Sequence, residues 1–152
     1  MKTVITYGTF DLFHIGHLNL LERLAGMGDK LIVGVSTDEF NLLKGKKSIH
    51  SFDERSRIIA ALSCVDLVIP ENDWQQKPQD IKHHQIDIFG MGEDWQDKFD
   101  DLSSLCEVRY LPRTANVSST EIKRSLATMK KEDVQNIKVY LDALNTIVNS
   151  LE

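Results

Sequence analysis

The chain has 152 residues, of which 41% are hydrophobic and 27% charged, so it is long enough to bury the core of one globular domain without disulfides or metals. Its formal net charge of −5 argues against nucleic acid or an anionic membrane as a partner. No apolar run approaches the length of a membrane span, so we expect no membrane insertion.

The two cysteines and the first residues of the chain indicate a cytoplasmic protein. Cys64 and Cys106 lie in apolar surroundings without the spacing of metal ligands, which is typical of reduced, buried thiols. A strand-like run begins almost at once, at Thr3, so we expect no signal peptide.

The first predicted strand, Thr3–Tyr7, leads through a turn into a helix whose apolar residues recur on one face. The turn carries His14, Gly16 and His17 in an H-x-G-H pattern. Free backbone N–H groups at a helix start and two imidazoles suit a triphosphate. A zinc site is less suited, because helical zinc pairs are spaced i, i+4 and no nearby cysteine or carboxylate completes a tetrahedral set. A solvated cap is the alternative for a single histidine.

From there the chain alternates between strand-like and helical patterns. Strands are predicted near residues 31–35, 67–69, 86–89 and 108–111, and helices near 18–28, 52–63, 79–84 and 118–126. This alternation predicts an α/β fold, a Rossmann-like, doubly wound parallel sheet of about five strands, with an added C-terminal helix. In such a sheet the ligand lies beyond the carboxyl ends of the strands, where the winding reverses.

Polar residues suited to phosphate and ribose follow the later strands at that same edge. Lys44 and Lys46 flank a glycine after the second strand, and Asp94 follows the fourth, where it could accept hydrogen bonds from ribose hydroxyls. Arg113 follows the fifth strand, shortly before Ser118 and Glu121, which are spaced as a capping box. Solvated lysines and ordinary helix caps are the alternative interpretations.

Several longer sequence motifs are similar to those of a known family. It resembles the nucleotidyltransferase α/β-phosphodiesterase superfamily and, within it, the glycerol-3-phosphate cytidylyltransferase family, from residue 1 to about Leu126. The words that carry the resemblance are Tyr7-Gly8-Thr9-Phe10-Asp11, Ser36-Thr37-Asp38-Glu39-Phe40-Asn41, Val65-Asp66-Leu67-Val68-Ile69-Pro70, Met91-Gly92-Glu93-Asp94-Trp95 and Leu111-Pro112-Arg113-Thr114. The chain departs from the family at Ser63, where Arg is frequent, at Asn116, where Gly is more usual, and at Ser119, where Thr is.

The resemblance implies a role for each matching position. It implies catalysis by His14, His17, Lys44, Lys46 and Arg113. It implies that CTP is bound by Thr9, Phe10, His14, His17, Lys46, Gly92, Asp94, Arg113, Thr114, Ser118, Ser119 and Thr120. It implies that glycerol phosphate is bound by Asp11, Lys44, Arg55 and Lys77. Arg55 either orders the basic loop or contacts phosphate, and Asp11 could hold a metal or a histidine.

The implied reaction is transfer of CMP from CTP to sn-glycerol 3-phosphate, with Mg²⁺ bridging the phosphates of CTP. The acceptor phosphate is already ionised, so in-line attack on the α-phosphorus requires no general base and no covalent intermediate. Alternatives are another nucleotidyltransferase of the same fold, with adenylate or a different phosphate acceptor, and a non-catalytic nucleotide-binding module. The family also suggests a homodimer.

The resemblance does not cover the tail, so we divide the chain into a cytidylyltransferase domain, 1–128, and an amphipathic helix, 129–152, that is not an independent domain. Its apolar residues are spaced 3, 4, 3, 4, 3, as in a coiled-coil seam: Val134, Ile137, Leu141, Leu144, Val148 and Leu151. Tyr140 and Ile147 widen this stripe, which is common in helices that pack on their own domain. Packing in cis and pairing with a second copy both remain open, and we expect either to affect assembly and not chemistry.

Overall fold

The computed structural model describes residues 1–151, with the side chains of Met129 and Lys130 excepted. Glu152, the last residue of the predicted tail, lies outside the described residues, as do those two side chains. The chain divides into two compact units, Met1–Val117 and Ser118–Glu152, and each unit is described by itself.

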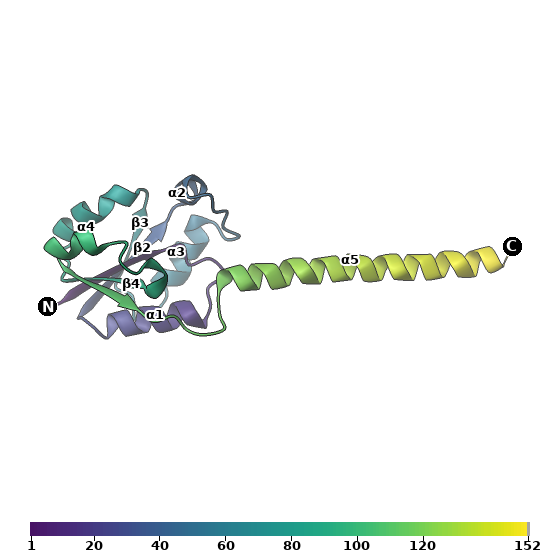
Figure 1. Cartoon of the computed structure of the whole chain (residues 1–152), viewed down its shortest axis with the longest axis horizontal. Helices are drawn as coiled ribbons and strands as arrows, with labels where there is room; N and C mark the ends of the chain where they lie inside the picture. The colour runs from purple at the N-terminus through teal and green to yellow at the C-terminus, as the bar shows by residue number, and fades with distance from the viewer. Residues whose placement is uncertain (152) are drawn as a thin grey trace. The chain divides into compact units, whose positions relative to one another are not determined.

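The first unit is built on one parallel sheet of five strands (Figure 1). The strands are β1 (Thr3–Gly8), β2 (Lys30–Ser36), β3 (Leu67–Glu71), β4 (Ile88–Gly92) and β5 (Glu107–Leu111). Their order across the sheet is β3-β2-β1-β4-β5, and every neighbouring pair is parallel. The winding reverses between β1 and β4, so the doubly wound, Rossmann-like fold predicted from the alternating pattern is confirmed.

The helices begin where the sequence supplies a cap. Thr37 caps α2 (Asp38–Leu43) by accepting the Phe40 N–H at 3.2 Å, and Ser51 forms a capping box with Glu54 at the start of α3 (Phe52–Ala60). The other helices of this unit are α1 (Ile15–Ala25), α4 (Lys77–His83) and the 3₁₀ turns η1 (Trp74–Gln76), η2 (Glu93–Trp95) and η3 (Asp100–Ser104). Helix α1 begins three residues before the predicted start because His14 caps it.

The sheet is buried on both faces because successive residues of its strands point to opposite sides. On one face, β1 and β2 residues such as Val4 and Val33 pack with Leu21 of α1 and Ile59 of α3. On the other face, Ile5 and its neighbours pack with α4, η3 and the aromatic residues between β4 and β5. Figure 1 shows helices on both sides of the sheet. With both faces covered, the carboxyl edge of the sheet remains for a ligand.

The second unit is one long helix, α5 (Ser119–Ser150). Ser118 caps it by accepting the Glu121 N–H at 3.0 Å, as the spacing of these residues predicted. The helical stretch predicted at 118–126 and the predicted tail helix are continuous in the structure. The division at residue 128 into domain and tail stays a prediction. Among the described residues, no helix is both long and apolar enough to cross a membrane.

Gly34 gives a test of how closely β1 and β2 are packed. A Cβ atom at Gly34 would lie 2.2 Å from Cδ1 of Tyr7, its neighbour across the two strands, whereas a Cβ at Gly92 would meet nothing within 4 Å. We expect Gly34→Ala to lower the free energy of unfolding by about 1–3 kcal/mol, the usual cost of overpacking. The matched Gly92→Ala change should cost less than about 0.5 kcal/mol. Equal losses in urea unfolding would contradict this packing.

Candidate functional site

The H-x-G-H motif builds its own helix start. His14 precedes α1, and its Nδ1 atom accepts the Gly16 N–H at 3.0 Å, while Nδ1 of His17 accepts the His14 N–H at 3.3 Å. The two rings stack with centroids 3.8 Å apart. A Cβ atom at Gly16 would lie 2.8 Å from Cε1 of His14, so only glycine leaves room for the His14 ring to fold back over the helix end. The glycine therefore serves the histidine directly.

This arrangement sets the protonation of both histidines. Burial lowers the pKa of His17 to about 4, assisted by the adjacent His14 and opposed by Asp11. Burial and the charge of Arg113 also lower the pKa of His14. Both rings are therefore neutral at pH 7. Because each Nδ1 accepts a backbone N–H, the remaining proton sits on Nε2. Each ring thus offers one Nε2–H donor for an anion at the helix start.

The turn before the helix is held in a strained shape by Asp11. Phe10 and Leu12 have φ values of 53° and 48°, which non-glycine residues adopt rarely. The buried Asp11 carboxylate accepts backbone N–H groups from Leu12, Ile49 and His50 at distances of 2.7–3.1 Å. Asp11 therefore ties the loop after α2 to the turn after β1.

Arg55 also connects the turn after β1 with the loop before α3. Its side chain is buried, and its guanidinium donates to the carbonyls of Thr9, Ser36 and His50 and to the Asp38 carboxylate, at 2.8–3.0 Å. These bonds link the ends of β1 and β2 to the start of α3. Of the two roles considered for Arg55, the structure favours ordering the loop over contacting phosphate.

A second cluster of charge lies at the carboxyl ends of β2 and β3. The ammonium groups of Lys44 and Lys77 each lie 3.8 Å from an oxygen of Glu71, and Lys44 also donates to Ser36 Oγ at 3.1 Å. Lys77 is 2% exposed, and its Nζ atom donates no hydrogen bond to any of the described residues. Two ammonium groups thus face the single carboxylate of Glu71, and the Lys77 ammonium can donate further hydrogen bonds.

Aromatic rings enclose these two ammonium groups. Lys44 Nζ lies 4.4 Å from the ring centroid of Phe40, and Lys77 Nζ lies 4.6 Å from that of Tyr7 and 5.0 Å from that of Trp74. Burial lowers the pKa of Lys44 to about 8 and also lowers that of Lys77, although Glu71 opposes both shifts. Burial raises the pKa of Glu71. We call Lys44, Glu71 and Lys77 with these rings the lysine cage.

Glu71 was not among the residues predicted for the site. It is the last residue of β3 and lies opposite Ser36 at the carboxyl edge of the sheet. Its position, two residues beyond the strand predicted at 67–69, was the available signal. Lys77 was predicted, but its burial was not, because α4 is polar in sequence.

A third group of predicted residues lies after β4 and β5. The Arg113 guanidinium is 3.4 Å from the carboxylate of Asp94, and the Arg113 N–H donates to Glu93 at 3.0 Å. Both charged side chains of the ion pair are about half exposed, so the pair is weak and can open for a ligand. Arg113 also lowers the pKa of His14, which shows that its charge reaches the histidines.

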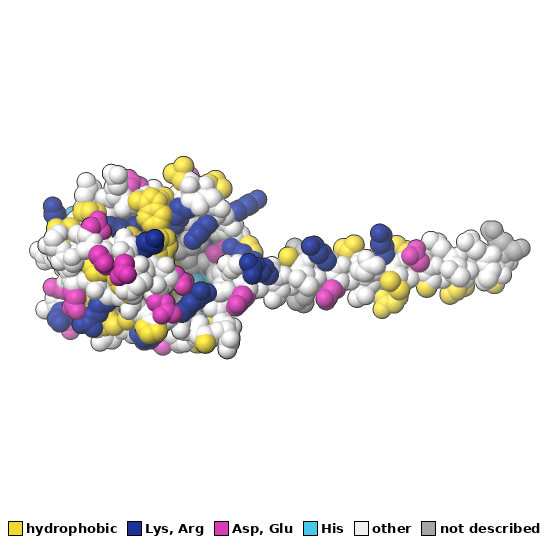
Figure 2. All heavy atoms as spheres, in the orientation of Figure 1, with side chains coloured by type: hydrophobic (Ala, Val, Ile, Leu, Met, Phe, Trp, Pro, Cys, Tyr) yellow, Lys and Arg dark blue, Asp and Glu magenta, His cyan; other side chains and the backbone are white. Residues whose placement is uncertain are grey.

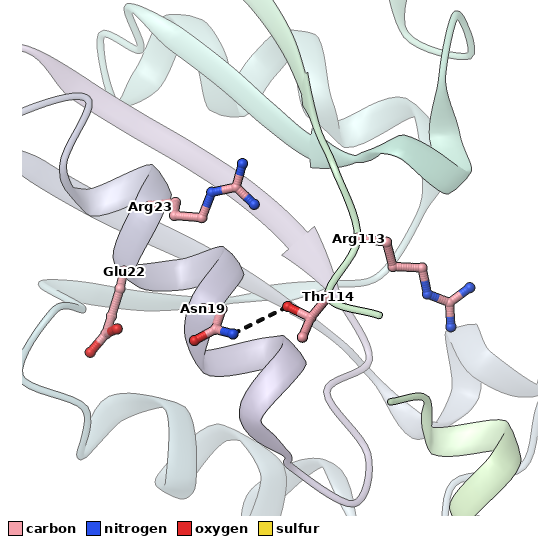
Figure 3. A pocket seen from close by; sticks show the side chains of 5 residues that line it. All are labelled: Asn19, Glu22, Arg23, Arg113 and Thr114. Atoms are coloured by element: carbon pink, nitrogen blue, oxygen red, sulfur yellow. Dashed lines mark hydrogen bonds between the residues drawn. The ribbon is translucent and has the colours of Figure 1, made fainter. Parts of the chain in front are cut away.

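The segment after β5 is fastened to α1 beside the histidines. Asn19 donates to Thr114 Oγ1 at 3.2 Å, and Arg23 donates to the Pro112 carbonyl at 3.0 Å. A pocket of about 370 Å³ is lined here by Asn19, Glu22, Arg23, Arg113 and Thr114 (Figure 3). In Figure 3 Asn19 points directly at Thr114, so Thr114 serves here to hold the segment against the helix.

The remaining residues predicted to bind CTP lie in several different segments of the chain. Thr9 donates through its hydroxyl to Asn41 at 3.0 Å, and Phe10 is buried against His17. Lys46 is exposed in the loop after Gly45, and Gly92 has open space where a side chain would be. Ser118, Ser119 and Thr120 begin the second unit, so their part in CTP binding stays a prediction.

Asn116 explains one departure from the family pattern. Its φ is 62°, in the left-handed region that glycine adopts without strain and asparagine tolerates better than other residues. Asparagine at a position where glycine is more usual therefore preserves the backbone.

The described residues do not form a protein-held metal site. Across residues 1–151, no three His, Cys, Asp or Glu side chains gather closely enough to hold an ion. Asp11, the predicted candidate, instead accepts three backbone N–H groups.

Comparison with known proteins gives one consistent family. The family described as cytidylyltransferase-like matches residues 5–125. The chain is similar to the glycerol-3-phosphate cytidylyltransferase of Bacillus subtilis, with 58% identity over 127 residues that cover 84% of this chain and 98% of the relative. It is 57% identical to that of Bacillus spizizenii over 129 residues, 85% of this chain and 100% of the relative. For the Staphylococcus aureus enzyme the identity is 52%, over 83% of this chain and 96% of the relative.

A solved structure supports the fold. The lipopolysaccharide core biosynthesis protein of Thermoplasma volcanium superposes with a TM-score of 0.68 and 25% identity, over 75% of this chain and 98% of that one. The overall fold therefore recurs in a known protein.

The low pKa of His17 predicts how stability changes with pH. Between about pH 4 and pH 6.5 the unfolded state binds a proton at this residue that the folded state excludes, so stability falls as the pH falls through this range. In His17→Asn, whose side-chain oxygen can still accept the His14 N–H, the slope of unfolding free energy against pH should fall by up to about one proton. The exposed His83, changed to Asn, is the control, and an unchanged slope in His17→Asn would refute the assignment.

Proposed function

Because this chain belongs to the cytidylyltransferase-like family and, within it, to the glycerol-3-phosphate cytidylyltransferases, we propose that it transfers CMP from CTP to sn-glycerol 3-phosphate, giving CDP-glycerol and pyrophosphate. The observation that carries the proposal is the presence of two separate anion-binding arrangements along one edge of the sheet. The histidine pair follows β1, and the lysine cage follows β2 and β3. A transferase that joins two phosphate-bearing substrates needs two such arrangements.

The histidine pair suits the triphosphate. Two neutral rings present Nε2–H donors at the start of α1, where the backbone N–H groups and the helix dipole also favour negative charge. Arg113 forms a half-exposed ion pair with Asp94, so its guanidinium can turn to the β- and γ-phosphates of CTP. Neutral donors are well suited here, because a donor that is fixed by the fold stabilises developing charge without reorganisation.

The lysine cage suits the acceptor phosphate. Within the part of the chain that the structure describes, the buried ammonium of Lys77 has no hydrogen-bond partner, and Lys44 is held by Ser36 and Glu71 in the same enclosure. A phosphate entering the cage would receive charged hydrogen bonds from both lysines and relieve their desolvation. The half-exposed Trp74 leaves one aromatic wall accessible for the carbon chain of a small polyol.

In the proposed reaction an oxygen of the acceptor phosphate attacks the α-phosphorus of CTP in line. The new P–O bond forms as the bond from the α-phosphorus to the bridging oxygen breaks, and pyrophosphate leaves with that electron pair. His14 and His17 donate to the α-phosphate as charge develops on it. Lys44 and Lys77 align the nucleophile, which is already an anion, so no side chain needs to take a proton.

We also make proposals for the metal ion, the oligomeric state and the cellular compartment of the protein. We expect Mg²⁺ to be held mainly by the phosphates of CTP, with Asp11 as a candidate protein ligand. We expect a homodimer, as the family resemblance suggests, and we expect the protein to work in the cytoplasm, which suits its free thiols at Cys64 and Cys106.

The direct test measures pyrophosphate release with CTP or ATP against a panel of phosphate acceptors. We expect release only when CTP and glycerol 3-phosphate are both present, with CDP-glycerol as the second product. Preference for ATP would support the alternative of adenylyl transfer. Binding of CTP without release for any acceptor would support a non-catalytic module.

The histidines can be tested by separating their two functions. His14→Ala and His17→Ala should each lower kcat by roughly a hundredfold or more, the scale of losing one charge-stabilising donor. For His17, Asn retains an acceptor for the helix cap and lacks a donor at the Nε2 position, so its kcat should fall while its thermal stability near pH 7 is largely kept. Near-normal kcat in these variants at saturating CTP would remove the histidines from the mechanism.

The lysine cage predicts effects on one substrate more than the other. Lys44→Ala and Lys77→Ala should raise KM for glycerol 3-phosphate by about tenfold or more, the scale of a lost charged hydrogen bond, and change KM for CTP less. A selective loss of CTP affinity in both variants would reverse the assignment of the two subsites.

Glu71 should control the pH range of acceptor binding. Its charge raises the pKa of Lys44 and Lys77, so in Glu71→Gln both pKa values fall further. The kcat/KM for glycerol 3-phosphate, which declines in the native protein as Lys44 loses its proton near pH 8, should then decline at lower pH. The exposed Glu39, changed to Gln, is the matched control. An unshifted profile in Glu71→Gln would contradict this role.

A further inference from the structure

The C-terminal part of α5 carries an apolar stripe that the proposed reaction does not use. The family match ends at residue 125, before the stripe begins at Val134. The stripe side chains are 55–81% exposed: Val134, Ile137, Leu141, Leu144, Val148 and Leu151. Figure 2 shows hydrophobic side chains at the surface along this helix. Such a row of exposed apolar side chains has to pack against another surface, because an isolated amphipathic helix is only marginally stable in water.

We propose that this stripe pairs with its counterpart in a second copy of the chain as a parallel, two-stranded coiled coil. The spacing fixes one heptad frame, with Val134, Leu141 and Val148 at position a and Ile137, Leu144 and Leu151 at position d. Two of the three a residues are β-branched, and two of the three d residues are leucine. That distribution favours two parallel strands over three or four.

The charges beside the stripe agree with the parallel arrangement. In this frame Asp133 occupies position g and Lys138 the next position e, so each Asp133 faces Lys138 of the other copy in a parallel pair. Towards the helix start, Lys123 falls at position d and Ala127 at position a, which ends the seam. The coiled coil is therefore short, and attachment to a dimer of the first unit would raise its effective concentration.

The composition of this helix does not favour a membrane surface as the cover. Residues 131–151 carry Lys131 and Lys138 against Glu132, Asp133 and Asp142, so the polar face has no cationic excess to bind anionic lipid. A second copy instead offers a surface that is complementary in both shape and charge, since it carries the same stripe and the same Asp133 and Lys138.

A cysteine at the seam distinguishes the possible covers. In the full-length chain with Val148→Cys, a parallel pair brings the two thiols together, whereas in an antiparallel pair with the stripes aligned, Val148 faces Ile137 and the thiols lie about 16 Å apart along the helix. We expect oxidised glutathione to give a disulfide-linked dimer. The neighbouring change Asn149→Cys, at the outer position b, and the native chain should remain largely unlinked, and all three should keep normal turnover.

Two further changes test the seam and its charges in the Val148→Cys background. Leu141→Asp should abolish the cross-link. Asp133→Lys should slow it several-fold, and adding Lys138→Asp to that variant should restore it. A monomeric mass in light scattering, a tetrameric mass, equal cross-linking of Val148→Cys and Asn149→Cys, or a failure of the double charge exchange to restore linkage would each overturn the proposal. So would a monomer whose α5 binds vesicles of anionic lipid.

Discussion

The buried guanidinium of Arg55 is the interaction on which the ligand edge of the sheet depends. A parallel sheet leaves backbone carbonyls unsatisfied where its strands end, and here Arg55 binds those of Thr9 and Ser36, together with His50 and the Asp38 carboxylate. The opposite charge on Asp38 and the four hydrogen bonds offset the cost of burying a cation. Because both strand ends share one rigid group, the turn that carries the histidines and the loop that carries Lys44 keep a fixed relation.

Asp11 completes this frame from the other side. Its carboxylate accepts N–H groups from the histidine turn and from the loop before α3, so an anion and a cation hold the same two segments from opposite directions. The resemblance implies that Asp11 and Arg55 bind glycerol phosphate, and that role stays a prediction beside the backbone contacts that both residues make. Removing Arg55 would leave the carbonyls of Thr9 and Ser36 without this donor, and removing Asp11 would leave three backbone N–H groups without this acceptor.

The side chains proposed to contact the substrates differ from Arg55 and Asp11, because their hydrogen bonds and ion pairs within the protein are incomplete. The ammonium group of Lys77 lies 4.6–5.5 Å from the ring centroids of Tyr7, Trp74 and Phe99, and 3.8 Å from the carboxylate of Glu71. His17 is buried enough to lose its proton near pH 4. An incoming phosphate therefore meets cations and donors that are already stripped of water. Binding energy can then go into alignment of the reacting atoms, since little solvent has to be reorganised.

The sequence by itself determined the fold class, the order of the elements and the starts of α3 and α5, because these depend on local signals such as apolar periodicity and the cap residue Ser118. It also located the histidines and Lys44 at strand ends. Only the tertiary structure decided that Arg55 and Asp11 bind backbone groups around the turn after β1, that Glu71 pairs with Lys44 and Lys77, that Lys77 is buried, and that Gly16 makes room for a histidine ring. Each of these depends on which side chains from distant segments meet, and on how much water that meeting excludes. Neither is encoded in spacing along the chain.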